Sequence, residues 1–208
     1  MARRTKEDAQ ATRAALLDAA ERVFQERGVS RTTLAEIATE AGVTRGALYW
    51  HFKDKADLFN AMMERVILPL ETDWKSLQES QGDPLPIWRS HLQRALWRLV
   101  HDEQTRRVLQ IAMQKVEHTP EMNAVVEHHI QTHRARAECE CEVLEQAARV
   151  RGIHLPAPAP ELAQGMHAMV HGLIYSWLLD RSIDLLATAK ASIDAFLHGI
   201  GLGPDKAG

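Results

Sequence analysis

The chain has 208 residues, of which 45% are hydrophobic and 25% charged, and its formal net charge is −3. This composition is typical of a globular protein of one or two domains. Two cysteines exclude a disulfide framework, and the net charge excludes a generally basic nucleic-acid-binding protein. Neither a signal peptide nor a membrane-spanning helix is predicted, so we expect a cytoplasmic protein.

The charge is unevenly distributed along the chain. Residues 1–55 carry ten lysines and arginines against eight acidic residues, whereas the remainder carries fifteen against twenty. This is the sign expected for a DNA-binding part joined to an acidic body. Residues 1–7 are predicted to be a flexible basic arm that reaches phosphates, or else a solvated terminus with no fixed role.

A first helix is expected from about Glu7 to Arg27, where Gly28 ends it. Residues 32–55 then predict two short helices joined by a tight turn. Thr33 and Glu36 have the spacing of a capping box. Gly42 can adopt the positive φ that ends a helix, and Thr44 is a good N-cap for the next one.

These two helices have the pattern of a helix-turn-helix motif. The predicted core of the three-helix part consists of Leu16, Val23, Phe24, Leu34, Ile37, Ala38, Val43, Leu48 and Phe52. Arg45, Gly46 and Tyr49 share the opposite, outward face of the second helix. Such a helix can enter a DNA major groove. An ordinary helical hairpin remains the alternative on this pattern alone.

The sequence GALYWHFKDKADLF at residues 46–59 resembles the end of the DNA-binding domain of the tetracycline-repressor (TetR) family. Residues 3–59 look most like the AcrR-like branch, which represses multidrug efflux pumps. The resemblance continues more loosely to residue 200 through PLPIWRSHL, QKVEHTPEM and YSWLLD. It implies a helix-turn-helix DNA-binding domain over residues 1–54 and a ligand-binding and dimerisation domain over residues 55–208.

The resemblance also implies roles for individual residues. Arg45 would donate to a base edge, Gly46 would permit close approach to the groove, and Tyr49 would contact a thymine methyl or a phosphate. The residues expected to hold the DNA backbone and set the register are Thr33, Thr44, His51 and Lys55. Two roles stay open for Trp50, as a wedge against DNA or as a core residue.

Lys55 lies in the first turn of the expected fourth helix. A lysine there opposes the helix dipole, so we infer that it is not present for helix stability. A phosphate between the helix N-terminus and Lys55 would remove this conflict. In the family that this chain resembles, the matching lysine contacts the DNA backbone.

The rest of the chain predicts further helices and no strand, so the expected fold is all-α with about nine helices. Breaks fall at Gly82-Asp83-Pro84 and at the LPAPAP linker, residues 155–160. After the first three helices, further helices are expected over about residues 55–78, 84–101, 119–152, 160–180 and 184–200. One more begins at about residue 104.

The last two expected helices, the eighth and the ninth, are apolar on more than one face. They therefore need two partners, and the family dimerises by packing these helices as a four-helix bundle. A homodimer would present two recognition helices about 34 Å apart and would select a near-palindromic operator. The alternative is that both faces are covered within one chain.

Methionine and aromatic side chains in the body suggest a site for a lipophilic inducer, with a cationic drug as one option. The resemblance places such ligands between the fourth and eighth helices. Glu117 or Glu71 would then pair with the cation, although a solvated position is the favoured interpretation for both acids and plain core is the favoured interpretation for the other residues. The candidates are Met62, Met63, Val66, Trp74, Trp88, Leu92, Met113, Glu117, Met166, Met169 and Trp177.

Other chemistry finds little support. His129 and His133, and separately His167 and His171, have the spacing of two metal ligands, but neither pair has an obvious third. No phosphate loop, nucleophile motif or cofactor motif is present, so we expect neither a cofactor, a metal nor an enzyme.

We therefore expect a ligand-responsive DNA-binding repressor, with efflux control inherited from the resemblance alone. The alternatives are a helical small-molecule binding protein that no longer reads DNA and a regulator of a metabolic operon. The sequence leaves open the operator, the inducer, the regulated genes and the sign of regulation.

Overall fold

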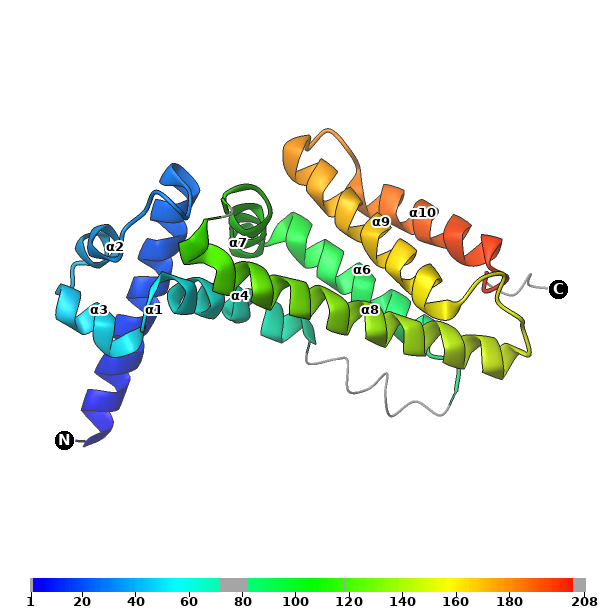
Figure 1. The fold of residues 1–208 in the computed structure, drawn as a ribbon, viewed down its shortest axis with the longest axis horizontal. Helices are drawn as coiled ribbons and strands as arrows, with labels where there is room; N and C mark the ends of the chain where they lie inside the picture. Colours follow the sequence, from blue (N-terminus) through cyan, green and yellow to red (C-terminus); the bar gives the residue numbers. More distant parts are fainter. Residues whose placement is uncertain (1, 72–81, 118, 204–208) are drawn as a thin grey trace. The chain divides into compact units, whose positions relative to one another are not determined.

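The structure is a computed structural model that describes residues 2–71, 82–117 and 119–203. Within these residues the chain forms nine α-helices and one 3₁₀ turn, so the predicted all-α fold is confirmed (Figure 1). In chain order they are α1 (Ala2–Arg27), α2 (Leu34–Glu40), α3 (Arg45–His51), α4 (Lys55–Glu71), α6 (Leu85–His101), α7 (Glu103–Gln114), the 3₁₀ turn η1 (Pro120–Met122), α8 (Asn123–Arg151), α9 (Ala159–Leu179) and α10 (Leu185–Gly199).

Most helix ends lie within one or two residues of the predicted positions. At the start of α10, the Asp184 carboxylate accepts a hydrogen bond from Ala187 N at 3.0 Å. The start of α1 differs, because this helix already begins at Ala2 and the predicted flexible arm is wrong. Residues 2–12 contain no glycine or proline and several strong helix formers, so nothing stops the helix there. The expected end of the fourth helix lies outside the described residues.

The chain divides into two compact units at points that the sequence did not predict. Residues 1–69 and 103–129 form the first unit, and residues 70–102 and 130–208 form the second. The predicted boundary after residue 54 falls inside the first unit. Packing and function divide a chain by different criteria, so the functional division at 54/55 stays a prediction.

The core of the first unit lies where α1 packs against α2, α3 and α7. Seven of the nine predicted core residues are buried, and Leu34 and Val43 are partly buried and pack against them. The core extends into α4, where the Phe59 ring lies 6.2 Å from the ring of Phe24.

Glu21 on α1 is buried, with only 2% of its surface exposed. Arg65 on α4 donates its Nη2 to Glu21 Oε1, and Gln104 Nε2 donates to the same oxygen at 2.9 Å. Arg107 Nε donates to the other carboxylate oxygen at 3.4 Å. A buried carboxylate requires such partners, and these three join α7 and α4 to α1.

The second unit is built on contacts of α10 with α6 and with α9. Arg151, at the end of α8, donates from Nε and Nη2 to Asp83 Oδ2, at 2.9 and 2.5 Å, and from Nη1 to the carbonyl of Gly203 at 2.7 Å. These bonds join three segments that are distant in sequence. No described helix combines the length and the apolar character that crossing a membrane requires.

We expect Glu21→Gln to lower the free energy of unfolding by about 2 kcal/mol, because two arginines lose their carboxylate partner. The expected loss is smaller than for a fully buried pair because Arg65 and Arg107 are 26% and 34% exposed and therefore partly screened. Urea unfolding followed by circular dichroism measures the change. Glu26→Gln, at an exposed position of the same helix, is the control. Equal losses in both variants would contradict this role of Glu21.

Candidate DNA-binding surface and ligand cavity

The start of α2 carries the predicted capping box. Thr33 N donates to Glu36 Oε2 at 2.8 Å, and Glu36 N donates to Thr33 Oγ1 at 3.3 Å. The bond from the Thr33 backbone, followed by the bond from its hydroxyl, lowers the pKa of Glu36, so this carboxylate is ionised at neutral pH. A seven-residue helix is too short to be stable alone, and these caps satisfy its first free N–H groups.

The turn between α2 and α3 is also as predicted. Gly42 has φ +69°, its N–H donates to Thr39 O at 3.0 Å, and Val43 N donates to Ala38 O at 3.0 Å. This is the Schellman arrangement, which satisfies the last carbonyls of a helix. Thr44 then caps α3, because its Oγ1 accepts from Ala47 N at 3.2 Å. The relative orientation of the two short helices is thus fixed by local bonds.

The two faces of α3 separate packing from recognition. Leu48 is fully buried and Phe52 at the C-cap is nearly so, whereas Arg45, Gly46 and Tyr49 are exposed. Arg45 Nη2 donates to the Tyr49 hydroxyl at 3.3 Å, with the guanidinium carbon 5.4 Å from the ring centroid. This pairing holds the arginine against α3 at the surface where a base edge would lie.

The two aromatic residues that follow Tyr49 differ in character. Trp50 is 73% exposed, so the core alternative for this residue is wrong. Its ring meets the His51 ring edge-on at a centroid distance of 4.6 Å. Burial, and secondly the charge of Arg13, lower the pKa of His51. A neutral imidazole at this position can donate one N–H to a phosphate but adds no positive charge.

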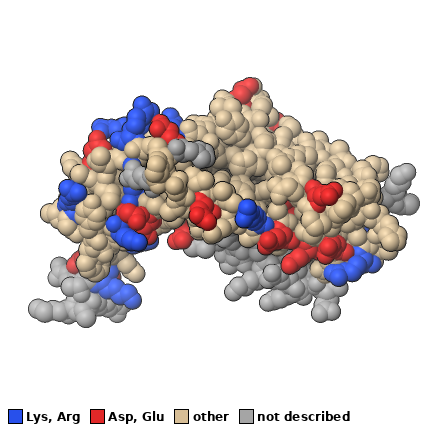
Figure 2. Space-filling view, viewed as in Figure 1, with Lys and Arg blue, Asp and Glu red and all other residues tan. Residues whose placement is uncertain are grey.

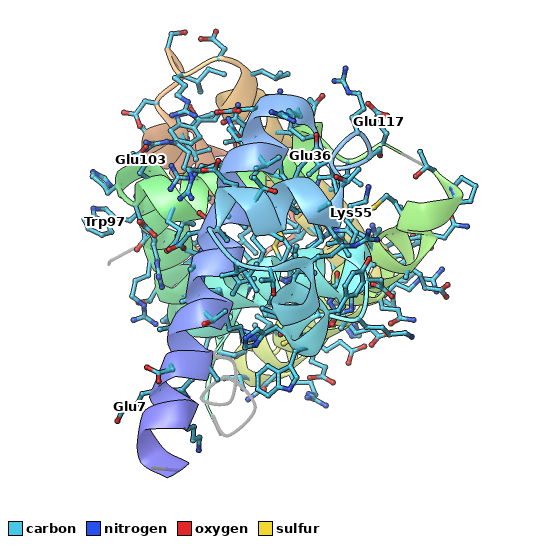
Figure 3. All side chains as sticks on the ribbon, turned by 90° about the vertical axis from the view of Figure 1, so that its left-hand side faces the viewer. Glu7, Glu36, Lys55, Trp97, Glu103 and Glu117 are labelled. Atoms are coloured by element: carbon cyan, nitrogen blue, oxygen red, sulfur yellow. The ribbon has the colours of Figure 1, made fainter. Side chains whose placement is uncertain are left out.

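Lys55 has partners that the sequence did not reveal. Its side chain is only 5% exposed, and Nζ donates to the carbonyls of Ser30 at 3.0 Å and Thr32 at 2.8 Å (Figure 3). These carbonyls compensate for the unfavourable position at the helix N-terminus. Lys55 therefore stabilises the contact between α4 and the loop before α2, a role that the sequence did not predict. Its contact with a DNA phosphate stays a prediction.

The loop that Lys55 binds, residues 28–32, also contacts the end of α7. Val29 N donates to Lys115 O at 3.0 Å, and Ser30 Oγ donates to Glu117 O at 3.4 Å. Within the loop, the Thr32 hydroxyl donates to Gly28 O at 2.7 Å. This short segment thus joins α1, α2, α4 and α7.

The structure contradicts the prediction that Glu117 is a buried acid in the ligand site. Its carboxylate is exposed and lies 4.0 Å from Arg31 Nε, beside the loop of residues 28–32 (Figure 3). The physical reason is that α7 ends at Gln114, so Glu117 follows the helix instead of facing its interior side.

The methionines and valine of α4 are buried in a core, and their role in a ligand site stays a prediction. Met62, Met63 and Val66 are buried in the hydrophobic core of the first unit, and their burial there was the alternative interpretation. Met113 on α7 is half-buried, and Trp74 lies outside the described residues.

The candidates on α9 are held within the second unit. Met166 is fully buried, Met169 is half-buried, and Trp177 is buried with the Arg181 guanidinium 5.0 Å from its ring centroid. None of the three lines the cavity between α6 and α10.

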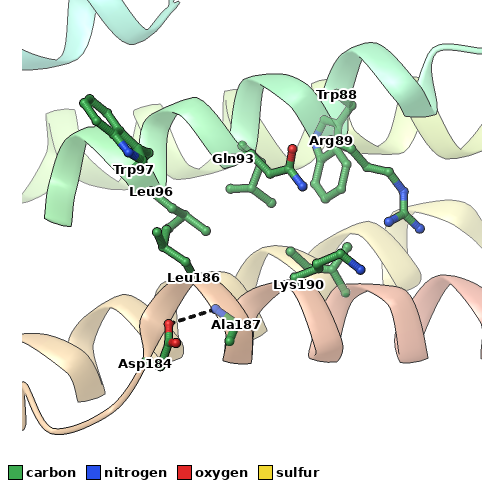
Figure 4. A pocket seen from close by; sticks show the side chains of 11 residues that line it. Trp88, Arg89, Gln93, Leu96, Trp97, Asp184, Leu186, Ala187 and Lys190 are labelled. Atoms are coloured by element: carbon green, nitrogen blue, oxygen red, sulfur yellow. Dashed lines mark hydrogen bonds between the residues drawn. The ribbon is translucent and has the colours of Figure 1, made fainter. Parts of the chain in front are cut away.

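That cavity has a volume of about 490 Å³ and lies between α6 and α10 (Figure 4). Of the predicted ligand residues, it contains Trp88 and Leu92. Its volume suits a drug-sized molecule. Sequence analysis missed its α10 wall because the apolar faces of that helix were attributed to a dimer. The lining residues are Trp88, Arg89, Leu92, Gln93, Leu96, Trp97, Asp184, Leu186, Ala187, Lys190 and Ile193.

His133, from one of the two histidine pairs considered in the sequence, meets both histidines of the other pair between α8 and α9. His133 Nδ1 lies 2.6 Å from His167 Nε2, and the His133 and His171 rings are 4.8 Å apart. Among the described residues, no group of three or more histidines, cysteines or acids has a geometry that could hold a metal ion. Burial raises the pKa of Cys139 to about 11, so this thiol is protonated at neutral pH and is a poor nucleophile.

Charge on the surface agrees with the modest asymmetry of the sequence. On the face drawn in Figure 2, basic side chains over α1–α3 are interspersed with acidic ones and do not form one continuous basic patch. Affinity for nucleic acid would therefore depend on a few placed contacts more than on a general attraction.

Comparison with family models gives two matches that cover most of the chain. Residues 16–62 match the family described as bacterial regulatory proteins, tetR family. Residues 83–201 match the C-terminal region of MAATS-type transcriptional repressors.

Individual proteins are similar along almost the whole length. The HTH-type transcriptional regulator TtgR of Pseudomonas putida is 41% identical over 211 residues, covering 98% of both chains. The crystal structure of NalD, the secondary repressor of the MexAB-OprM multidrug efflux pump in Pseudomonas aeruginosa, has a TM-score of 0.84 at 35% identity and covers 92% of this chain and 98% of NalD. A SmeT–triclosan complex has a TM-score of 0.81 at 31% identity and covers 91% of each chain. SmeT is described as the repressor of the Stenotrophomonas maltophilia efflux pump SmeDEF.

We expect Thr33→Ala to lower the free energy of unfolding by about 1 kcal/mol, because α2 loses its N-cap. Thermal or urea unfolding measures the effect. Thr39→Ala is the matched control, since the Thr39 hydroxyl only donates back to Ala35 O within the same helix. A loss in the control as large as that in Thr33→Ala would show that the cap is not the cause.

Proposed function

Because the chain belongs to the TetR family of bacterial regulatory proteins, we propose that it is a DNA-binding repressor of a multidrug efflux operon. A lipophilic small molecule releases it from its operator. The observation that carries the proposal is the doubly capped helix-turn-helix, which leaves Arg45, Gly46 and Tyr49 exposed on one face of α3. Such a protein acts in the cytoplasm, where it reaches the chromosome.

Three residues of α3 read the major groove in this proposal. Arg45 exchanges its bond with Tyr49 for guanine N7 and O6. Tyr49, then released, contacts a thymine methyl or a phosphate. A Cβ on Gly46 would meet only Thr44 Oγ1 at 3.9 Å, so packing within the protein does not require glycine. The close approach of DNA is therefore the reason for a small residue there.

Other residues hold the DNA backbone and set the register. Thr33 and Thr44 lie at helix N-termini, where N–H groups and the helix dipole attract phosphate. His51 donates one N–H to a phosphate, and Lys55 contacts a phosphate at the first turn of α4. Trp50 packs its exposed ring against the sugar-phosphate backbone as a wedge at the edge of the site.

A homodimer forms through α9 and α10, which correspond to the eighth and ninth helices expected from the sequence. Both helices have exposed faces with small residues, including Gly165, Ala168 and Gly172 on α9 and Ala191 and Ala195 on α10. Small side chains permit close approach of helices from a second copy. The dimer then spaces two copies of α3 by about 34 Å and selects a near-palindromic operator.

The inducer enters the cavity between α6 and α10 and shifts the population towards a form in which the half-site spacing is lost. Such a shift requires the inducer to have a higher affinity for the form that does not bind DNA than for the form that does. NalD and SmeT are described as repressors of multidrug efflux pumps, and SmeT has been crystallised with triclosan. These relatives support a lipophilic inducer and an efflux operon.

Fluorescence anisotropy with a labelled duplex from the DNA just upstream of the gene for this protein tests the proposal. We expect binding that weakens steeply with salt and that is reversed by triclosan. Failure of triclosan to release the protein would keep the repressor but remove this inducer candidate. Binding no tighter than to a scrambled duplex, for every upstream fragment of the genes next to its own, would favour the small-molecule binding protein instead.

Two substitutions separate base recognition from positioning. We expect Arg45→Ala to remove about 1–3 kcal/mol of discrimination at one base step without a change in the free energy of unfolding. Lys55→Ala should weaken binding to all sequences alike, flatten the salt dependence and lower stability, because two carbonyls lose their donor. Anisotropy with single-base operator variants measures both. A change of base preference in Lys55→Ala but not in Arg45→Ala would overturn these roles.

A further inference from the structure

The cavity between α6 and α10 has one strongly polar end. Arg89 on α6 donates its Nη1 to Asp194 Oδ1, and Lys190 Nζ donates to Asp194 Oδ2 at 2.8 Å (Figure 4 labels Arg89 and Lys190). The bonds from Lys190 and then Arg89 lower the pKa of Asp194, so it carries a full negative charge at neutral pH. Two cations thus share one carboxylate, and one positive charge at this end is left without a balancing acid.

The same arginine has an unused donor. Arg89 Nη2 is buried, and it has no hydrogen-bond partner among the described residues. The side chain as a whole is 27% exposed and lines the cavity. Because this nitrogen has almost no accessible surface, it does not face the cavity, and Arg89 acts on a ligand there through its charge.

The acids around the cavity are already engaged and leave little to attract a cation. Asp184, at the other end, caps α10 by accepting from Ala187 N, and Asp194 is shared between the two cations. The remaining wall is mostly apolar, with the rings of Trp88 and Trp97 and the side chains of Leu92 and Leu96. Aromatic and aliphatic walls favour a flat apolar ligand body.

We propose that this cavity binds an aromatic acid, with the carboxylate at the Arg89 and Lys190 end and the ring between Trp88 and Trp97. The assignment rests on the proposed function, in which this cavity takes the inducer, and it replaces the cationic drug expected from the sequence. The Lys190 ammonium, on a side chain that is 65% exposed, donates to the ligand carboxylate, and Arg89 supplies the second favourable charge.

Three isosteric probes that differ only in charge test the assignment. At neutral pH 2-naphthoate is anionic, 2-naphthamide is neutral and 2-naphthamidine is cationic, and isothermal titration calorimetry on the full chain measures each affinity. We expect 2-naphthoate to bind at least about tenfold more tightly than 2-naphthamide in low salt, and 2-naphthamidine to bind most weakly. Equal affinities, tighter binding of the cation or no saturable binding of any probe would overturn the proposal.

Variants locate the charge preference. Lys190→Gln, at a side chain that is 65% exposed and thus harmless to folding, should reduce the ratio of naphthoate to naphthamide affinity several-fold. Arg89→Gln should reduce the ratio further and leave naphthamide binding within about twofold. Arg94→Gln, on the same helix but not lining the cavity, is the matched control and should preserve the ratio. An unchanged ratio in both Arg89→Gln and Lys190→Gln would place the anion elsewhere.

The readout separates this assignment from the wider function. Probe affinity is measured without DNA, so a lost charge preference refutes the aromatic acid while the DNA anisotropy stands. Conversely, selective binding of 2-naphthoate that depends on Arg89 but never releases the operator would keep the site and refute its role as the inducer site.

Discussion

The buried ammonium group of Lys55 organises the DNA-binding part of this protein. It donates to two carbonyls of the loop that connects α1 to α2, and the same loop is bound by the last carbonyls of the α7 segment. Helices α1, α2, α4 and α7 therefore all contact the five residues of this loop, 28–32. The position of α2, and through its Schellman turn that of α3, follows from how this loop is held. A change at α7 would reach the recognition helix through these few bonds.

The ends of helices could be predicted because the information is local. Thr33 and Glu36, Gly42, Thr44 and Asp184 each bond to a partner within about four residues, so their spacing in the sequence determines the geometry. Periodic apolar residues likewise identified the buried face of each helix. The start of α1 was missed for a related reason, because no stop signal marked it and charge was mistaken for flexibility.

The contacts that could not be predicted join residues that are far apart along the chain. Lys55 binds residues 23 and 25 positions away, and Glu21 binds residues 83 and 86 positions away. Nothing in the sequence distinguishes such a buried charge from an ordinary solvated one. The same limit applies to the ligand site. Residue type suggested methionines, of which Met62 and Met63 are buried in the core of the first unit. The cavity between α6 and α10 is created by the apposition of two helices and has two cations that composition could not place.

The buried carboxylate of Glu21 limits how this protein can be recombined. Family members invite the construction of chimeras, in which the operator specificity of one regulator is grafted onto the inducer response of another. A transplant cut after α3 would carry Glu21 but leave behind Arg65, Gln104 and Arg107. The transplantable piece is instead discontinuous and includes α7. Regulators of this type would exchange specificity more readily by substitutions on the face of α3 than by the exchange of whole domains.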